Sequence, residues 1–173
     1  MLSPEFRDTL LNLNPNDNQG IRFLLADVYH YIGDEKSAEK YYKKYGEPEG
    51  AYNYALLLYS TGQKSRAIRL LRNSIKAAPL VAIMLRAYLK MFNFWQEKGV
   101  FGLGKNPPLF LHRNAVIGAW NENIDRAKNY ADYLQLKSAH DFCSLYGPLW
   151  LRQNDSYTLL LEAMNATAGN NRR

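Results

Sequence analysis

His140, Asp141 and Cys143 lie within four positions and include side chains of the kind that nucleophilic catalysis uses. A cysteine nucleophile needs a histidine base within hydrogen-bond reach, and positions i and i+3 of a helix share a face. The neighbouring sequence offers no third group to orient His140 and no oxyanion donor. We therefore interpret Cys143 as a core thiol beside an ordinary histidine, and we predict no catalytic residue.

The other residues that could do chemistry do not form ligand patterns. The three histidines are far apart in the sequence, and a single cysteine excludes a disulfide framework and a cysteine-rich zinc site. Residues 102–105 (GLGK) lack the GxxxxGK[ST] spacing of a phosphate loop. We predict no metal site, no cofactor and no enzymatic activity.

Length and composition are those of one globular domain. The chain has 173 residues, of which 47% are hydrophobic and 22% charged. No run approaches the roughly 18 apolar residues of a membrane span. Residues 1–13 lack the basic start and continuous apolar run of a secretory signal. We expect no membrane association and a cytoplasmic location.

An internal repeat is the strongest pattern in the chain. When the sequence is shifted by 29 residues, Gly33 falls on Gly62, and positions on both sides of the two glycines agree in type. The agreement follows helical spacing, which is typical of a helix hairpin used twice. The matched pairs are Leu25/Tyr54, Ala26/Ala55, Tyr29/Leu58, Gly33/Gly62, Ala38/Ala67 and Tyr42/Leu71.

These residues resemble tetratricopeptide (TPR) repeats, which combine small residues, a glycine turn, aromatics and a final proline. The better match is 49–79; the unit 19–46 is about five residues shorter than the usual repeat of about 34, and both lack the early tryptophan. The run 13–24 (LNPNDNQGIRFL) is similar to a signature of the suppressor-of-tumorigenicity-seven-like group of mostly uncharacterised proteins. That resemblance covers roughly residues 10–152 and implies a helical fold with interaction work.

The sequence predicts an all-α fold of stacked helix hairpins, a TPR-like α-solenoid with a divergent helical C-terminal half. We expect one domain over 1–166. It contains a partial repeat helix (3–13), the two repeats, a long helix (80–98), a loop (99–108) and divergent helices (109–165). Within that last part we expect helices near 122–136 and 138–146, a break at Gly147-Pro148, and a last helix near 155–165. Residues 167–173 are expected to form a flexible tail.

The first helix of each repeat suggests a binding groove. In TPR-like stacks these helices line the concave face, and related repeats often place an asparagine where Asn53 stands. Its carboxamide can bond both N–H and C=O of an extended peptide, so Asn53→Ala is expected to weaken binding and leave stability nearly unchanged. Alternatively, Tyr52, Leu56 and Tyr59 are core residues. The predicted groove residues are Phe23, Asp27, His30, Tyr31, Tyr52, Asn53, Leu56 and Tyr59.

Basic residues suggest a second surface. Residues 1–50 carry six basic and nine acidic side chains, whereas residues 51–173 carry sixteen and seven, and no acid stands between Glu49 and Glu97. The spacing of the second-repeat cations places them on the outer side of one helix. They form either a solvated surface or a docking site for an acidic protein or nucleic acid. We call Arg66, Arg69, Arg72 and Lys76 the basic face.

We expect a non-catalytic protein–protein interaction module that binds a protein or peptide segment through the groove or an exposed face. One alternative is an acidic-ligand or nucleic-acid binder that uses region 64–90. No DNA- or RNA-reading motif is present, which disfavours nucleic acid. The other alternative is a self-association unit, a homo-oligomer joined through the apolar end of an incomplete repeat.

Overall fold

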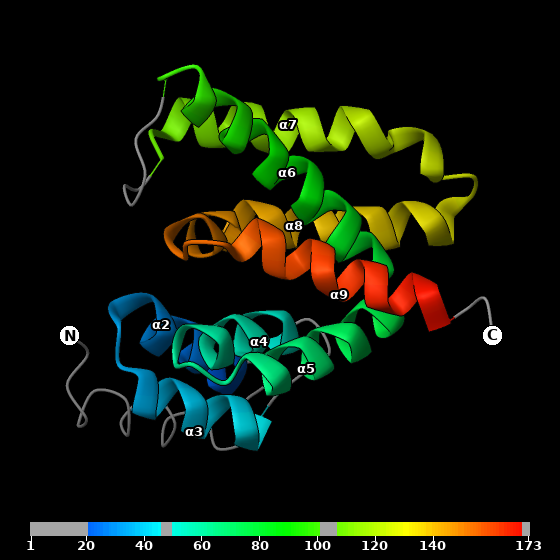
Figure 1. Ribbon diagram of the computed structural model, residues 1–173. Helices are drawn as coiled ribbons and strands as arrows, with labels where there is room; N and C mark the ends of the chain where they lie inside the picture. Colours follow the sequence, from blue (N-terminus) through cyan, green and yellow to red (C-terminus); the bar gives the residue numbers. More distant parts are fainter. Residues whose placement is uncertain (1–20, 46–49, 101–106, 171–173) are drawn as a thin grey trace.

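The computed structural model describes residues 21–45, 50–100 and 107–170, and in these ranges the chain is all-α, as predicted (Figure 1). The expected helix at 3–13 lies outside the described residues. None of the described helices has both the length and the apolar composition that crossing a bilayer requires. The elements are α2 (Ile21–Ile32), α3 (Glu35–Tyr45), α4 (Gly50–Ser60), α5 (Lys64–Ala77), α6 (Pro79–Glu97), α7 (Leu109–Asn123), the short 3-10 helix η1 (Ile124–Arg126), α8 (Tyr130–Arg152) and α9 (Ser156–Asn170).

The pairs α2–α3 and α4–α5 are two hairpins with the same turn. Gly33 and Gly62 both adopt φ = +82°, a left-handed conformation that glycine takes without a steric penalty. The amide after each glycine donates to the carbonyl five residues earlier, Asp34 to Tyr29 at 2.9 Å and Gln63 to Leu58 at 2.8 Å. The 29-residue shift in sequence is therefore a repeat of local structure.

Small residues let the paired helices approach closely. Each of the four hairpin helices carries one almost fully buried alanine, Ala26, Ala38, Ala55 or Ala67. Large side chains fill the space around them, since Leu25, Tyr29, Tyr41 and Tyr42 form one apolar cluster with Leu57 of α4. Packing of this kind contributes roughly 25 cal/mol for each Å² of apolar surface removed from water.

The helix α4 is buried on opposite sides. Its sequence, GAYNYALLLYS, contains no charged residue. Leu57 joins the cluster of the first hairpin. Tyr52, Ala55 and Leu56 instead join the larger core that α4 forms with α5–α9. A helix that is apolar all round needs cover all round, so the C-terminal half must fold back onto α4.

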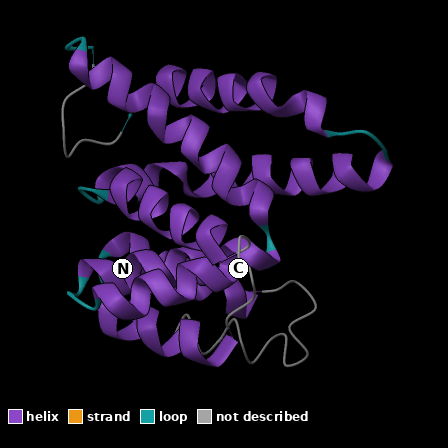
Figure 2. Cartoon of the chain, turned by 45° about the vertical axis from the view of Figure 1, so that its right-hand side comes forward, coloured by secondary structure: helices purple, strands orange, loops and turns teal. Residues whose placement is uncertain are grey.

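The helices are arranged in layers. In Figure 1 the hairpins α2–α5 lie below, α8 and α9 form the middle, and α6 rises through them to α7 above. Figure 2 shows the same separation from another side. The larger core runs through all these layers and is centred on α6, which packs against α7, α8 and α9. The second hairpin and the C-terminal helices are thus joined through one interior.

The predicted helix break at Gly147-Pro148 is wrong, because α8 continues through these residues to Arg152. Proline has no N–H to donate to the carbonyl four residues earlier, which leaves the Ser144 carbonyl without its helical partner. His112 of α7 replaces that partner, with Nε2 donating to the Ser144 oxygen at 3.0 Å. Its Nδ1 then accepts from the Tyr88 hydroxyl at 2.8 Å. Burial lowers the pKa of His112, which favours this neutral form.

Other expectations for the second half were wrong in position. The predicted helix at 122–136 spans the break between α7 and α8, and Asn129 caps α8 by accepting from the Asp132 amide at 2.9 Å. Ser138 lies inside α8 and does not start a helix there. Residues 167–170, expected in the flexible tail, extend α9. The cap at Asn129 and the long-range hydrogen bond at Pro148 set the boundaries of α8.

Gly147→Ala should destabilise the protein, because a Cβ at this position would lie 2.5 Å from Cζ of the buried Tyr88 ring. We expect a loss of about 1–3 kcal/mol, or roughly 2–4 °C in Tm per kcal/mol at this size. Gly169→Ala is the matched control, since nothing lies within 4 Å of its added Cβ and alanine favours a helix. Thermal unfolding followed by circular dichroism tests both, and equal melting of Gly147→Ala and wild type would contradict the close contact.

Candidate functional site

Asp27, Asn53 and Trp150 form a buried polar chain through the centre of the molecule. Asn53 of α4 donates from Nδ2 to Asp27 Oδ1 of α2 at 2.9 Å, and accepts at Oδ1 from Trp150 Nε1 of α8 at 3.0 Å. Asn53 and Trp150 are both 0% exposed. A carboxamide has a donor and an acceptor at one end, which lets it join two helices that lie on different sides of α4.

The chain continues at both ends. At the α2 end, Tyr42 of α3 donates to Asp27 Oδ1 at 2.6 Å, and His30 Nδ1 lies 3.2 Å from the same hydroxyl. At the α8 end, Ser156 Oγ donates to the Trp150 carbonyl at 2.6 Å. The polar chain therefore runs from the first hairpin to the start of α9. We call Asp27, Tyr42, Asn53, Trp150 and Ser156 the polar bridge.

Burial determines the charge states around the polar bridge. Desolvation raises the pKa of Asp27, while hydrogen bonds from Tyr42, Asn53 and Tyr146 partly offset that effect. Desolvation, with a smaller contribution from the positive charge of Arg152, lowers the pKa of His30 to about 4. His30 is therefore neutral near pH 7 and serves as a hydrogen-bonding group.

The groove predicted from sequence is not open at its centre. Tyr52, Asn53 and Leu56 are 0–1% exposed, because α8 and the larger core cover this side of α4. Tyr52 stacks at a tilt on Phe142 and donates to the Ala78 carbonyl at 2.8 Å. The expectation that these three residues face a ligand is wrong, and Asn53→Ala can no longer be expected to leave stability unchanged.

The other predicted groove residues have different surroundings. Asp27 and His30 are partly buried in and beside the polar bridge, and Tyr59 is half-buried against the larger core. Tyr31 is 42% exposed. Arg152 lies 4.9 Å from the centre of the Tyr31 ring and donates to the Tyr31 carbonyl at 2.9 Å. The side chain of Phe23 lies outside the described residues.

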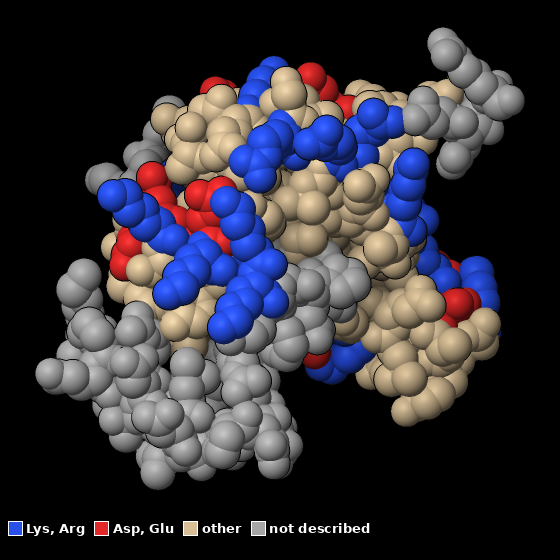
Figure 3. Space-filling view, turned by 90° about the horizontal axis from the view of Figure 1, so that it is seen from below, with Lys and Arg blue, Asp and Glu red and all other residues tan. Residues whose placement is uncertain are grey.

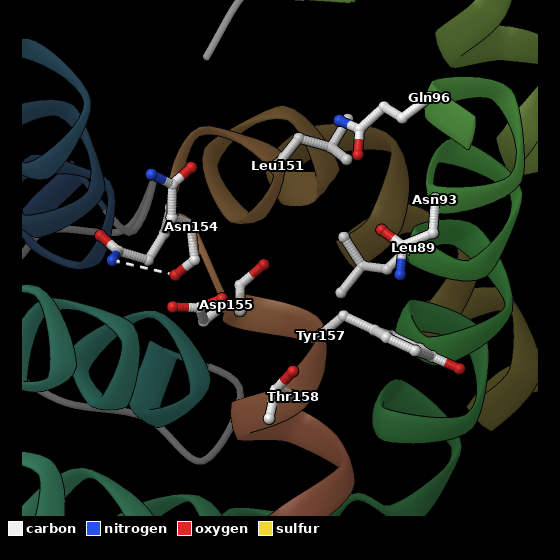
Figure 4. Close-up of a pocket in the computed structure, with 10 residues that line it drawn as sticks. Leu89, Asn93, Gln96, Leu151, Asn154, Asp155, Tyr157 and Thr158 are labelled. Carbon is white, nitrogen blue, oxygen red and sulfur yellow. Dashed lines mark hydrogen bonds between the residues drawn. The ribbon is translucent and has the colours of Figure 1, made fainter. Parts of the chain in front are cut away.

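A different hollow opens next to Arg152 (Figure 4). It is a cleft of about 660 Å³ between α6 and the connection from α8 to α9. Asn93 and Gln96 of α6 form one wall, and the α8–α9 connection faces them across the opening. We call it the amide cleft; its lining residues are Leu89, Asn93, Gln96, Leu151, Gln153, Asn154, Asp155, Ser156, Tyr157 and Thr158.

The lining of the amide cleft suits a peptide backbone. Four carboxamides, of Asn93, Gln96, Gln153 and Asn154, offer donors and acceptors, and Leu89 and Leu151 supply apolar floor. The volume lies within the roughly 300–1,000 Å³ of ligand sites. Asp155 is the only charged lining residue and has a left-handed backbone at φ = +64°, so the chain turns sharply into α9.

The walls of the amide cleft are tied to the rest of the molecule. Ser156 belongs to the lining and to the polar bridge, and Arg152 attaches the same connection to α2. Sequence reasoning missed this site because α6 and the α8–α9 connection are more than fifty residues apart. The one local signal was the polar run Gln153-Asn154-Asp155-Ser156 between two apolar helices.

The basic face lies on the outer side of α5, as predicted. Arg66, Arg69 and Lys76 are exposed, and Arg72 is half-buried. Figure 3 shows Lys and Arg side chains gathered over α5 and over the neighbouring α3. The structure thus separates two surfaces, a basic one on α5 and an amide-rich one at α6 and α9.

Cys143 and His140 do not form a nucleophile–base pair. The thiol is 0% exposed, and burial raises the pKa of Cys143, which disfavours the thiolate. His140 Nδ1 lies 3.1 Å from Asp141 Oδ1, and its ring packs against Trp120. In the part of the chain that the structure describes, no group of three or more His, Cys, Asp or Glu residues is placed to hold a metal ion.

Comparisons of the chain with protein-family models, with curated proteins and with solved structures each returned no match. The likeness to TPR repeats and to the suppressor-of-tumorigenicity-seven-like group therefore remains a prediction from the residues.

Asn53→Ala should lower the free energy of unfolding by roughly 2–4 kcal/mol, because it leaves the buried Trp150 N–H without an acceptor and removes a donor from Asp27. Asn93→Ala in the amide cleft should change it by less than about 0.5 kcal/mol. Urea unfolding of both variants beside wild type is the measurement. Equal midpoints for the two variants would show that the polar bridge does not stabilise the fold.

The pH dependence of stability should carry opposite contributions from His30 and Asp27. Since the pKa of His30 is lowered from 6.5 to about 4 by burial, its contribution is full above pH 6.5 and is lost as the pH falls to about 4. Since burial raises the pKa of Asp27 above 3.8, its contribution grows as the pH falls through the raised value.

On acidification, the His30→Gln variant should therefore lose less stability than wild type. The Asp27→Asn variant should lose more, because the stabilising contribution of Asp27 is gone. Urea unfolding at intervals from pH 7 to pH 4 measures both slopes. If the two variants change the slope in the same direction, the electrostatic account of the polar bridge is wrong.

Proposed function

We propose that this chain is a non-catalytic protein-interaction module of TPR-like architecture that binds an extended segment of a partner protein in the amide cleft. The observation that carries the proposal is the row of carboxamides on both walls, beside an apolar floor. Carboxamides match the alternating N–H and C=O groups of a peptide without requiring a particular side chain. Tyr157 adds a rigid aromatic surface with a polar tip.

Rigidity of the walls favours binding. Binding costs less conformational entropy when the site is already ordered before the ligand arrives. Here one wall is a turn of the long helix α6, and the other is held by Ser156 and by the contacts of Arg152 with Tyr31. The proposal keeps the interaction role expected from the repeats and moves it from the first helices of the hairpins to α6 and α9. A TPR-like scaffold in the cytoplasm would place this cleft where partner segments are available.

Site-specific photocrosslinking tests this function. The photoreactive residue p-benzoylphenylalanine would replace Gln96 or Asn154, which lie on opposite walls of the amide cleft, or Arg113, which is exposed on α7 as a control. We expect both cleft positions to crosslink the same partner in cells of the source organism, with the crosslinks mapping to one continuous segment, and Arg113 to leave it unlabelled.

Asn93→Leu, combined with either photoreactive position, should abolish that crosslink because it removes two polar groups from the wall while keeping a side chain of similar size. Equal labelling from Arg113 and from the cleft, or no labelling at all, would overturn the proposal. Crosslinks only to a second copy of the chain would favour self-association instead.

A further inference from the structure

Most of the basic face of α5 has no acidic partner among the described residues. Among the described residues, Lys64 at the start of α5 pairs with Glu162 of α9 at 3.2 Å. No acid lies within salt-bridge distance of Arg69 or Lys76 in the same part of the chain. Within the described ranges, Glu162 therefore pairs with the beginning of α5, and the cations of the following turns have no acidic partner.

The exposed side chains on α5 form a straight stripe. Arg66, Arg69, Asn73 and Lys76 are exposed and stand at i, i+3, i+7 and i+10, while Ala67, Leu71 and Ile75 on the other side are buried. At 1.5 Å per residue this stripe is about 15 Å long. The same spacing of three and four residues describes one face of any α-helix, so a partner helix with acids at these intervals places one acid opposite each of the three cations and one opposite the Asn73 amide.

Arg72 flanks the stripe. Its Nε atom is buried and has no hydrogen-bond partner in the described structure, and the residue as a whole is half-buried. Partial burial restricts the rotamers that the Arg72 side chain can adopt in the free protein. It therefore costs less to engage a carboxylate than a fully mobile lysine does.

Nucleic acid fits this surface less well than an acidic helix. Single strands are held by aromatic side chains on which bases stack, and α5 (KSRAIRLLRNSIKA) contains no aromatic residue. Among the described side chains of α3, the two aromatic ones, Tyr41 and Tyr42, are buried. The lysines of α3 extend the positive field beyond α5 (Figure 3) but supply no stacking surface.

We propose that the basic face docks an acidic α-helix of a partner protein, with carboxylates at i, i+3, i+7 and i+10 opposite Arg66, Arg69, Asn73 and Lys76. Arg72 supports one carboxylate from the side. This surface is separate from the amide cleft, so a test of one proposal does not decide the other. Binding by exposed charges is salt-sensitive and modest in affinity.

A designed peptide provides the probe. It is an alanine-based 21-residue helix with glutamates at i, i+3, i+7 and i+10, and its control has the same composition with the glutamates spread around the helix. Binding of the fluorescent peptides to the full chain is followed by anisotropy at about 0.1 M salt. We expect the first peptide to bind about tenfold more tightly than the control.

Charge reversal locates the site. The double variant Arg69→Glu, Lys76→Glu should bind the first peptide about tenfold more weakly than wild type does. Arg113→Glu with Lys128→Glu makes the same change in net charge at exposed positions outside α5 and should leave binding within about twofold. Circular dichroism confirms that both variants remain folded.

Three results would overturn the proposal. The two peptides could bind equally tightly, or the two double variants could weaken binding of the first peptide to the same extent. A 20-nucleotide single-stranded RNA could also bind at the same residues more tightly than the first peptide does. The last would assign the surface to nucleic acid.

Discussion

The arrangement of the molecule depends on one constraint, the uncharged helix α4. A helix with no charged side chain has no face that water can occupy cheaply, so it must be covered on opposite sides. The first hairpin covers the side that carries Leu57, and α8 with the larger core covers the side that carries Tyr52 and Leu56. The two apolar clusters are built on opposite faces of this one helix, which is why the two halves of the chain form one body.

Asn53 solves the problem that this burial creates. A polar side chain at the centre of an apolar helix must find partners inside the protein, because an unsatisfied buried group costs about 1–3 kcal/mol. Asp27 and Trp150 satisfy its donor and its acceptor, and they belong to helices on different sides of α4. Hydrogen bonds have directions, and these two therefore specify how the first hairpin and α8 are rotated about α4. Apolar packing alone specifies that less sharply.

Pro148 inside α8 creates a similar problem, because the Ser144 carbonyl loses its helical hydrogen-bond partner. His112 supplies the donor that the Ser144 carbonyl lacks, Tyr88 donates to His112, and Gly147 provides the room for the tyrosine ring. The helix can then continue to Arg152 and deliver the α8–α9 connection to the wall of the amide cleft.

Local patterns in the sequence determined the all-α class, the two hairpins and their turns. The positive φ of Gly33 and Gly62, the buried alanines and the exposed cations of α5 follow from spacing within about thirty residues. The tertiary structure alone decided that Asn53 is interior, since its partner Trp150 stands 97 positions away. It also decided that Pro148 lies inside a helix and that Asn93 faces Asn154 across a cleft. Helical periodicity shows which side of a helix is apolar, but the element that covers that side is chosen by packing between distant segments, and single-sequence spacing carries no record of that choice.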